Sequence, residues 1–191
     1  MSRINSTFTK LSNKNKKALI PFITAGDPHP EMTLDLLNAL VDSGADMIEL
    51  GIPFSDPMAD GPVIQRASER ALANNVGICQ TIDLVKEFRI KNKTTPIILM
   101  GYANPIEAIG VDNFVKLIKD AEVDGVITVD YPPEESVDFV ELLQKNNIDS
   151  IFLLSPTTED KRVQLIIEQS TGFIYLSLIH ISEPTRPSSL S

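Results

Sequence analysis

The feature that most constrains the fold is a regular alternation of short apolar runs with longer stretches of helical periodicity. The apolar runs lie at residues 19–24, 47–51, 96–100, 125–129, 150–154 and 172–177. They are continuous rather than alternating, which is typical of strands covered on both faces, although Pro21 would remove one hydrogen bond from the first run. Alternating strands and helices predict a parallel sheet with right-handed crossovers.

The stretches between the runs carry apolar side chains three and four residues apart, as on one face of a helix. Two such stripes are Leu36, Leu37, Leu40 and Val41, then Phe114, Leu117, Ile118 and Ala121. Gly44 is expected to end the first helix, and Thr157 with Asp160 predicts a capping box for a later one. A weaker helix is expected at residues 82–89 and an extra N-terminal helix within residues 1–15.

Two architectures fit this alternation, an open doubly wound sheet and a (β/α)8 TIM barrel. No glycine-rich dinucleotide motif and no Walker motif follows a strand, which disfavours the nucleotide-binding fold. Six βα units already occupy 177 residues, whereas eight need about 250. We therefore expect an α/β chain whose residues 1–177 form an incomplete TIM-barrel domain. Residues 178–191 leave the pattern and are expected to be a non-native or disordered tail.

Charge and composition exclude several classes of function. The chain has 17 basic and 26 acidic residues, a net charge of −9, which argues against a nucleic-acid partner. No apolar run approaches the ~18 residues that span a bilayer, so no membrane role is expected. The N-terminal 17 residues are polar, unlike a signal peptide. The single cysteine, Cys79, fits a reducing compartment and reads as a small apolar residue. Cytoplasmic location is the expectation.

Glu49 is the first candidate for chemistry because it lies inside an apolar strand. A carboxylate there is costly to desolvate unless it is paired or protonated. Strand alternation places Glu49 on the same face as Met47 and Gly51, opposite Ile48 and Leu50. In a barrel this side chain would point inward near the carboxyl end of its strand, where active sites lie. The alternative is a structural ion pair with a buried lysine or arginine.

The loop at residues 52–62 contributes two further carboxylates, Asp56 and Asp60. Asp60 precedes Gly61 and Pro62, so it could simply be a helix N-cap. Beside Glu49 it could also be a second catalytic carboxylate, since two carboxylates in different environments can divide acid and base roles. A Mg²⁺ or Ca²⁺ site made by these three carboxylates is a further alternative. We expect no metal.

Several apolar and aromatic side chains are predicted at or near strand ends, where they would either pack in the core or wall an apolar pocket. They are Phe22, Met100, Tyr102, Ile127 and Tyr175.

Four segments together resemble one family, the α subunits of tryptophan synthase. The longest is IELGIPFSDPMADGP at residues 48–62, and three shorter ones are PFITAGDP at 21–28, MGYANP at 100–105 and DYPPEE at 130–135. The resemblance extends from about residue 8 to residue 177. It implies a TIM-barrel lyase subunit of tryptophan biosynthesis that cleaves indole-3-glycerol phosphate to indole and glyceraldehyde 3-phosphate by a retro-aldol reaction.

The resemblance also implies roles for individual residues. Glu49 would be the general acid and base, and Asp60 would hydrogen-bond the indole N–H. Phe22, Met100 and Ile127 would wall the indole ring, and Tyr175 would position Glu49 or the substrate. The family's partner is a β subunit that carries pyridoxal phosphate, in an α2β2 heterotetramer, and the α chain itself binds no cofactor. The residues implied at that interface are Pro53, Phe54, Asp56, Tyr102, Asn104, Asp130 and Pro132.

The sequence departs from the family after residue 177, where the family continues into a lid loop and the loops that bind the substrate phosphate. Two alternatives therefore stay open. One is a non-catalytic fragment that docks on the β subunit and activates it. The other is a different barrel enzyme, such as an indole-glycerol-phosphate synthase, which should carry a catalytic lysine at a strand end. No predicted strand contains a lysine.

Overall fold

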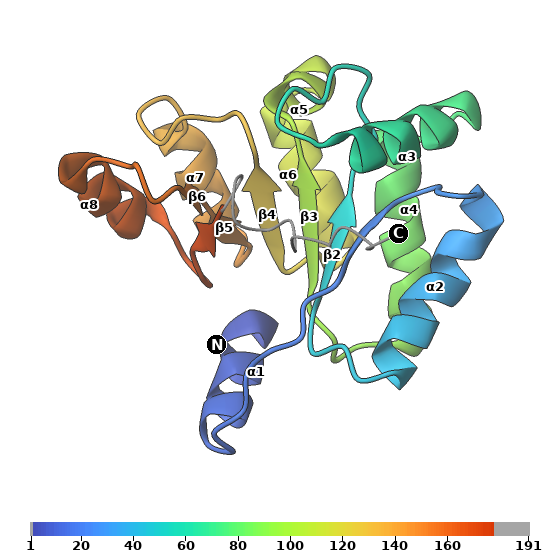
Figure 1. Cartoon of the computed structure of the whole chain (residues 1–191), viewed down its shortest axis with the longest axis horizontal. Helices are drawn as coiled ribbons and strands as arrows, with labels where there is room; N and C mark the ends of the chain where they lie inside the picture. Colours follow the sequence, from blue (N-terminus) through green and yellow to red (C-terminus); the bar gives the residue numbers. More distant parts are fainter. Residues whose placement is uncertain (1, 178–191) are drawn as a thin grey trace, which may run out of the picture.

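The computed structural model describes residues 2–177, which form a curved parallel sheet with helices along its outer side (Figure 1). Five strands form the main sheet in the order β1-β2-β3-β4-β5, and β6 pairs in parallel with β7. The strands are β1 (Phe22–Thr24), β2 (Ile48–Gly51), β3 (Ile97–Gly101), β4 (Gly125–Thr128), β5 (Asp149–Ile151), β6 (Leu153–Leu154) and β7 (Tyr175–Leu176). The sequential strand order confirms the predicted parallel βα architecture.

Helix α1 (Arg3–Ser12) precedes the first strand, and the helices that follow it cover the outer face of the sheet. These outer helices are α2 (Pro30–Asp42), α3 (Pro62–Ala73), α4 (Ile78–Lys91), α5 (Ala103–Ile109), α6 (Val111–Asp120), α7 (Val137–Lys145) and α8 (Asp160–Gln169). The largest apolar core lies between these helices and the sheet, where Phe88 of α4 and Phe114 of α6 pack with Ile48, Leu50 and Leu99. No helix within residues 2–177 is long and apolar enough to cross a membrane.

A second, smaller core lies on the inner face of the sheet and confirms the predicted alternation along β2. Met47 packs there with Ile98, Ile127 and Ile151, while Ile48 and Leu50 face the helices. Helix α1 supplies Ile4 to this inner core. Figure 1 shows α1 below the strands, so it covers the inner face near the end at which the strands begin.

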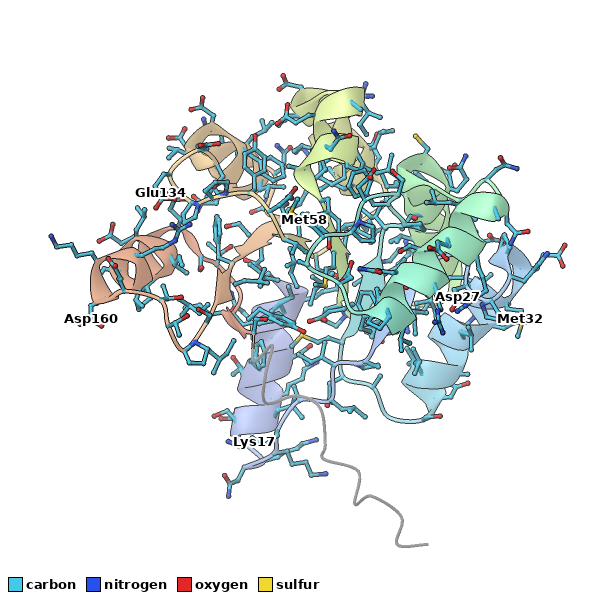
Figure 2. All side chains as sticks on the ribbon, turned by 45° about the horizontal axis from the view of Figure 1, so that its top comes forward. Lys17, Asp27, Met32, Met58, Glu134 and Asp160 are labelled. Carbon is cyan, nitrogen blue, oxygen red and sulfur yellow. The ribbon has the colours of Figure 1, made fainter. Side chains whose placement is uncertain are left out.

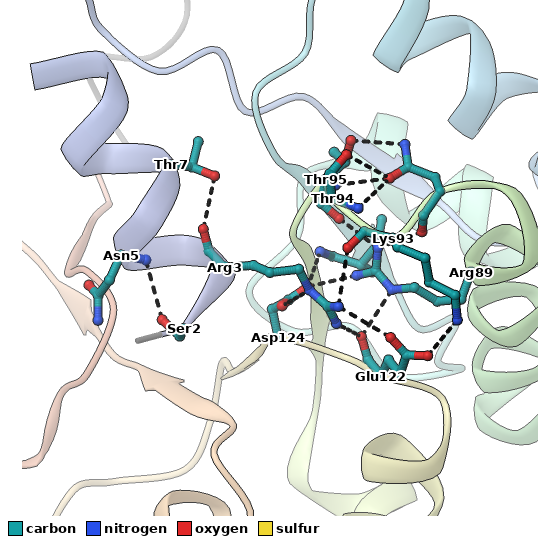
Figure 3. A network of polar contacts seen from close by, with 12 residues as sticks. Ser2, Arg3, Asn5, Thr7, Arg89, Lys93, Thr94, Thr95, Glu122 and Asp124 are labelled. Carbon is teal, nitrogen blue, oxygen red and sulfur yellow. Dashed lines mark hydrogen bonds and ion pairs between the residues drawn. The ribbon is translucent and has the colours of Figure 1, made fainter. Parts of the chain in front are cut away.

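An ion-pair network fixes α1 to the beginning of β4 (Figure 3). Arg3 Nε donates to Asp124 Oδ1 at 2.6 Å, and Arg89 Nη2 donates to Asp124 Oδ2 at 2.7 Å. Glu122 joins the network through Arg3 at 3.2 Å and Lys93 at 2.6 Å. Burial lowers the pKa of Arg89 to about 10, an effect opposed by the charge of Asp124. The network therefore balances the charge of the buried Arg89 guanidinium. It lies where the strands begin, away from their carboxyl ends.

Several local predictions from the sequence are wrong. The fifth predicted strand divides into β5 and β6, and the first is shorter than expected because the ladder begins after Pro21. The capping box at Thr157 does not form: the N-cap of α8 is Glu159, and the hydroxyl of Thr157 lies 3.0 Å from that of Ser155 instead. Gly44 follows the C-cap Ser43 with a φ of 101°, close to the predicted helix end. The proposed tail, residues 178–191, lies outside the described residues.

Candidate active site

Glu49 lies on the inner face of β2, as predicted, and its side chain is buried at 4 % exposure. Its register partners are Phe22 on β1 and Ile98 on β3. Within residues 2–177 the Glu49 carboxylate makes no ion pair and no hydrogen bond. No lysine or arginine in this part of the chain therefore forms the structural ion pair that was the alternative. Burial raises the pKa of Glu49 to about 7. A carboxyl group with this pKa can both donate and accept a proton near neutral pH.

The raised pKa predicts a specific dependence of stability on pH. In the unfolded chain Glu49 titrates near its ordinary value of 4.5, and in the folded chain near 7. Between these values the folded state holds the extra proton, so the free energy of unfolding falls as pH rises from about 4.5 to about 7 and levels off above it. The expected contribution is ~3 kcal/mol. Urea unfolding at a series of pH values should show this slope, and Glu49→Gln should flatten it. Equal slopes in both proteins would contradict the raised pKa.

Asp60 lies in the loop that connects β2 to α3, and Tyr102 holds its carboxylate. The Tyr102 hydroxyl donates to Asp60 Oδ2 at 2.9 Å and accepts a hydrogen bond from the backbone N–H of Ala59 at 3.1 Å. Partial burial raises the pKa of Asp60, and the hydrogen bond from Tyr102 opposes that shift. The N-cap alternative for Asp60 is wrong, because Gly61 occupies the N-cap of α3 and Pro62 begins the helix.

A small cavity opens at the carboxyl ends of β1, β2 and β3, beside Asp60. Its lining is Phe22, Thr24, Gly51, Ile52, Asp60, Ile64, Ser68, Met100, Gly101, Tyr102 and Val129. Glu49 lies two residues before Gly51 on the same face of β2, next to Phe22. A Cβ at Gly51 would lie 2.6 Å from Cζ of Phe22, so a larger residue here would require the ring to shift. Phe22, the register partner of Glu49, thus lines the cavity, whereas Glu49 is not among the lining residues.

The other predicted wall residues occupy the same inner side. Met100 lines the cavity, whereas Ile127, its register partner on β4, lies deeper in the inner core. Tyr175 also packs on the inner core, and its pKa is raised by burial and by the negative charges of Glu49 and Asp60. The positioning role that the resemblance implied for Tyr175 stays a prediction.

The residues expected at a partner interface do not share one environment. Asp56, Asn104 and Asp130 are exposed, and Phe54 and Pro132 are half-buried. Pro53 and Tyr102 are buried, and the Tyr102 hydroxyl is bonded to Asp60. Tyr102 also lines the cavity, and its ring centroid lies 5.3 Å from that of Phe54. The interface role of these seven residues stays a prediction.

The loop before α3 is the most exposed apolar feature beside the cavity. Met58 at its tip is 83 % exposed. Figure 2 brings the carboxyl ends of the strands forward and labels Met58 near the middle of the view.

Asp130 is exposed and also holds the start of α5, since its carboxylate accepts a hydrogen bond from the N–H of Ala103 at 2.7 Å.

Sequence reasoning missed seven of the eleven lining residues of the cavity, namely Thr24, Gly51, Ile52, Ile64, Ser68, Gly101 and Val129. A usable signal existed for Thr24, which lies two residues after Phe22 and therefore on the same face of β1. Ile64 and Ser68 come from α3, whose path over the cavity could not be read from the sequence. Within residues 2–177 no group of three or more histidine, cysteine or acidic side chains could hold a metal ion. None of the described strands contains a lysine.

The parallel sheet with outer helices identifies the chain as part of a TIM barrel. The carboxylates at the carboxyl ends of its strands lie where enzymes with this fold have their active sites. The sequence model of the family described as tryptophan synthase alpha chain matches residues 8–180. The tryptophan synthase alpha chain of Ralstonia nicotianae is 58 % identical over 175 residues, which cover 92 % of this chain and 66 % of the relative. This chain belongs to the tryptophan synthase alpha chain family.

Solved structures show the same similarity. The crystal structure of the α subunit from Legionella pneumophila strain Paris matches with a TM-score of 0.91 and 50 % identity, over 93 % of this chain and 68 % of that one. A chain of the α2β2 complex from Pyrococcus furiosus matches with a TM-score of 0.79 and 46 % identity, over 83 % of this chain and 64 % of that one. The chain thus spans about two thirds of the length of the relatives it matches.

Proposed function

We propose that this chain carries the acid–base half of a lyase active site that cleaves indole-3-glycerol phosphate to indole and glyceraldehyde 3-phosphate in tryptophan biosynthesis. The observation that supports this proposal is Glu49, a buried carboxyl group with a pKa raised to about 7 on the inner face of the sheet. Asp60 lies beside the neighbouring cavity with its own pKa raised by burial. Membership of the family supplies the class of substrate.

The reaction requires a proton at carbon 3 of the indole ring. Glu49, in its protonated form, would donate that proton, so that the ring carbon becomes a competent leaving group. The resulting carboxylate would then remove the proton from the adjacent hydroxyl of the glycerol chain. As that O–H bond breaks, the carbonyl of glyceraldehyde 3-phosphate forms and the electron pair of the C–C bond returns to the ring. Glu49 ends the cycle protonated, so the proton balance closes.

Asp60 would stabilise the charge that develops during this step. Protonation at carbon 3 leaves positive charge on the ring nitrogen, and an ionised carboxylate that accepts the N–H hydrogen bond stabilises it. The Tyr102 hydroxyl favours the ionised form of Asp60 by donating to it. Phe22, Met100 and Ile127 would provide the apolar wall for the ring, and Tyr175 would position Glu49 or the substrate.

The proposal includes a partner and a location. The Pyrococcus furiosus relative is described in an α2β2 complex, and we propose that this family member docks on a β subunit through the loops that contain Phe54, Asp56 and Asn104. We further propose that the chain uses no cofactor of its own, pyridoxal phosphate being expected in the β subunit. The cytoplasm is the proposed location.

The test compares two proteins. One is the 191-residue chain as it stands, and the other joins residues 1–177 to the C-terminal part of the Ralstonia nicotianae relative. Release of indole from indole-3-glycerol phosphate by the extended protein, in the presence of a β subunit, is the expected result. An extended protein that folds, binds the β subunit and releases no indole would contradict the proposal. If the 191-residue chain raises β-subunit turnover of indole without cleaving the substrate, that chain is the docking fragment.

A further inference from the structure

Thr24 is a buried hydroxyl residue of the cavity that neither the sequence patterns nor the proposed chemistry uses. It is the last residue of β1 and is 6 % exposed. Its Oγ1 has no hydrogen-bond partner within residues 2–177. A buried hydroxyl without a partner is destabilising, and each such group in a native structure requires an explanation. An acceptor that Thr24 meets only when the cavity is occupied would satisfy this hydroxyl.

The register of the sheet aims Thr24 into the cavity. Thr24 pairs with Gly51 on β2, and Phe22, two residues earlier, pairs with Glu49. Phe22 and Thr24 therefore project from the same face of β1, toward the inner side. Both line the cavity that Asp60 borders. Gly51, the register partner of Thr24, carries no side chain, and the ring of Phe22 lies against it.

Asp60 is the acidic side chain that lines this cavity, and its carboxylate can accept further hydrogen bonds. Its Oδ2 accepts from Tyr102, while its Oδ1 makes no hydrogen bond within the described part of the chain. An ionised carboxylate offers about four acceptor positions. Within the described residues, the cavity lining thus includes one hydroxyl donor without an acceptor and one carboxylate oxygen without a donor.

We propose that Thr24 is a positioning residue for Asp60. When an aromatic ligand with a ring N–H fills the cavity, the Thr24 hydroxyl donates to Oδ1 of Asp60 while Tyr102 stays on Oδ2. The two hydroxyl groups then hold the carboxylate in one orientation and leave a lone pair directed at the ligand N–H. The identity of that ligand as indole rests on the proposed function, whereas the contact between Thr24 and Asp60 rests on the cavity.

Indole itself is the probe, and its fluorescence is readable because the chain contains no tryptophan. Thr24→Val keeps the shape of the side chain and removes the hydroxyl, and we expect it to weaken indole binding about tenfold to a hundredfold, as for a hydrogen bond to a charged group. Thr24→Ser keeps the donor and should stay within about threefold of the unchanged chain. Thr94→Val, at an exposed position before β3, is the matched control and should leave binding unchanged.

Stability and pH distinguish positioning from a purely structural role. Removing an unpartnered hydroxyl should raise the melting temperature of Thr24→Val by roughly 2–4 °C, so binding and stability should move in opposite directions. As the pH is lowered, Thr24→Val should lose indole binding at a higher pH than the unchanged chain does. The reason is that Asp60 without the Thr24 donor is protonated more easily. A Thr24→Val protein with weaker binding and a lower melting temperature, with no rescue by serine, would assign Thr24 to packing alone.

A double-mutant cycle decides whether the effect passes through Asp60. In an Asp60→Ala background, Thr24→Val should change indole affinity by less than about twofold. An equal loss in both backgrounds, or no binding of indole by the unchanged chain, would overturn the inference. If the coupling is found but the extended protein does not cleave indole-3-glycerol phosphate, the proposed function fails and the inference stands. If the extended protein cleaves indole-3-glycerol phosphate but the cycle shows no coupling between Thr24 and Asp60, the inference fails and the proposed function stands.

Discussion

Replacing Glu49 by glutamine in the extended protein is expected to reduce indole release at least ~1,000-fold, a loss of ~4 kcal/mol in transition-state stabilisation. Glutamine matches glutamate in size but cannot donate the proton to the indole ring or remove the one from the glycerol hydroxyl. The side chain is buried and unpaired within residues 2–177, so no ion pair is broken by the change. Steady-state kinetics with indole-3-glycerol phosphate measures the effect.

The controls separate chemistry from folding. Glu31→Gln makes the same chemical change at a side chain that is 89 % exposed, and its activity should match that of the unchanged protein. Glu49→Gln should unfold at the same or a higher urea concentration near neutral pH, because it removes a carboxyl group whose charged form is disfavoured by burial. A Glu49→Gln protein that retains near-full cleavage would remove Glu49 from the mechanism.

Replacing Asp124 by asparagine is expected to destabilise the fold by about 3–5 kcal/mol. Asp124 is 5 % exposed and receives hydrogen bonds from Arg3, from Arg89 and from the N–H of Ile97 at 2.8 Å. Asparagine would leave the guanidinium of Arg89, itself 2 % exposed, without a counter-charge in the interior. Its amide NH2 would also face donors rather than acceptors. Urea unfolding monitored by circular dichroism measures the change.

The matched control for this prediction is Asp83→Asn. Asp83 pairs with Lys86 at 2.8 Å on the exposed face of α4, and an exposed pair of this kind contributes only about 0.3–0.5 kcal/mol. A difference of several kcal/mol between the two variants would show that burial, rather than pairing alone, determines the cost. An Asp124→Asn protein within 1 kcal/mol of the unchanged chain would contradict the compensating role of the network.

The parts of the fold that follow from local periodicity were predictable from the sequence. The inner face of β2, with Met47 and Glu49 opposite Ile48 and Leu50, required only the alternation of a strand and the assumption of outer helices. Helices α2 and α6 required only apolar spacing. In contrast, α5 was missed because its seven residues carry too few apolar positions for a stripe. Thr157 failed as a cap because its hydroxyl bonds within the preceding turn.

The parts that depend on distant contacts were not predictable. Tyr102 and Asp60 are 42 positions apart, and no local pattern relates a strand-end tyrosine to one particular carboxylate. The same applies to Arg3, whose partner Asp124 lies 121 positions away. Glu49 could be located because an acid in an apolar strand is unusual by itself, whereas the side chains that surround it are ordinary until the strands are placed side by side.

The attachment of α1 has a consequence for the order in which the molecule is made. Arg3 and Ile4 leave the ribosome before their partners Asp124 and Ile127, which emerge more than a hundred residues later. At ~5–20 residues per second, the first helix waits roughly 6–24 s before it can dock. During that interval only the earlier inner-core residues Met47 and Ile98 are available to Ile4, and the Asp124 partner of Arg3 has not yet been made.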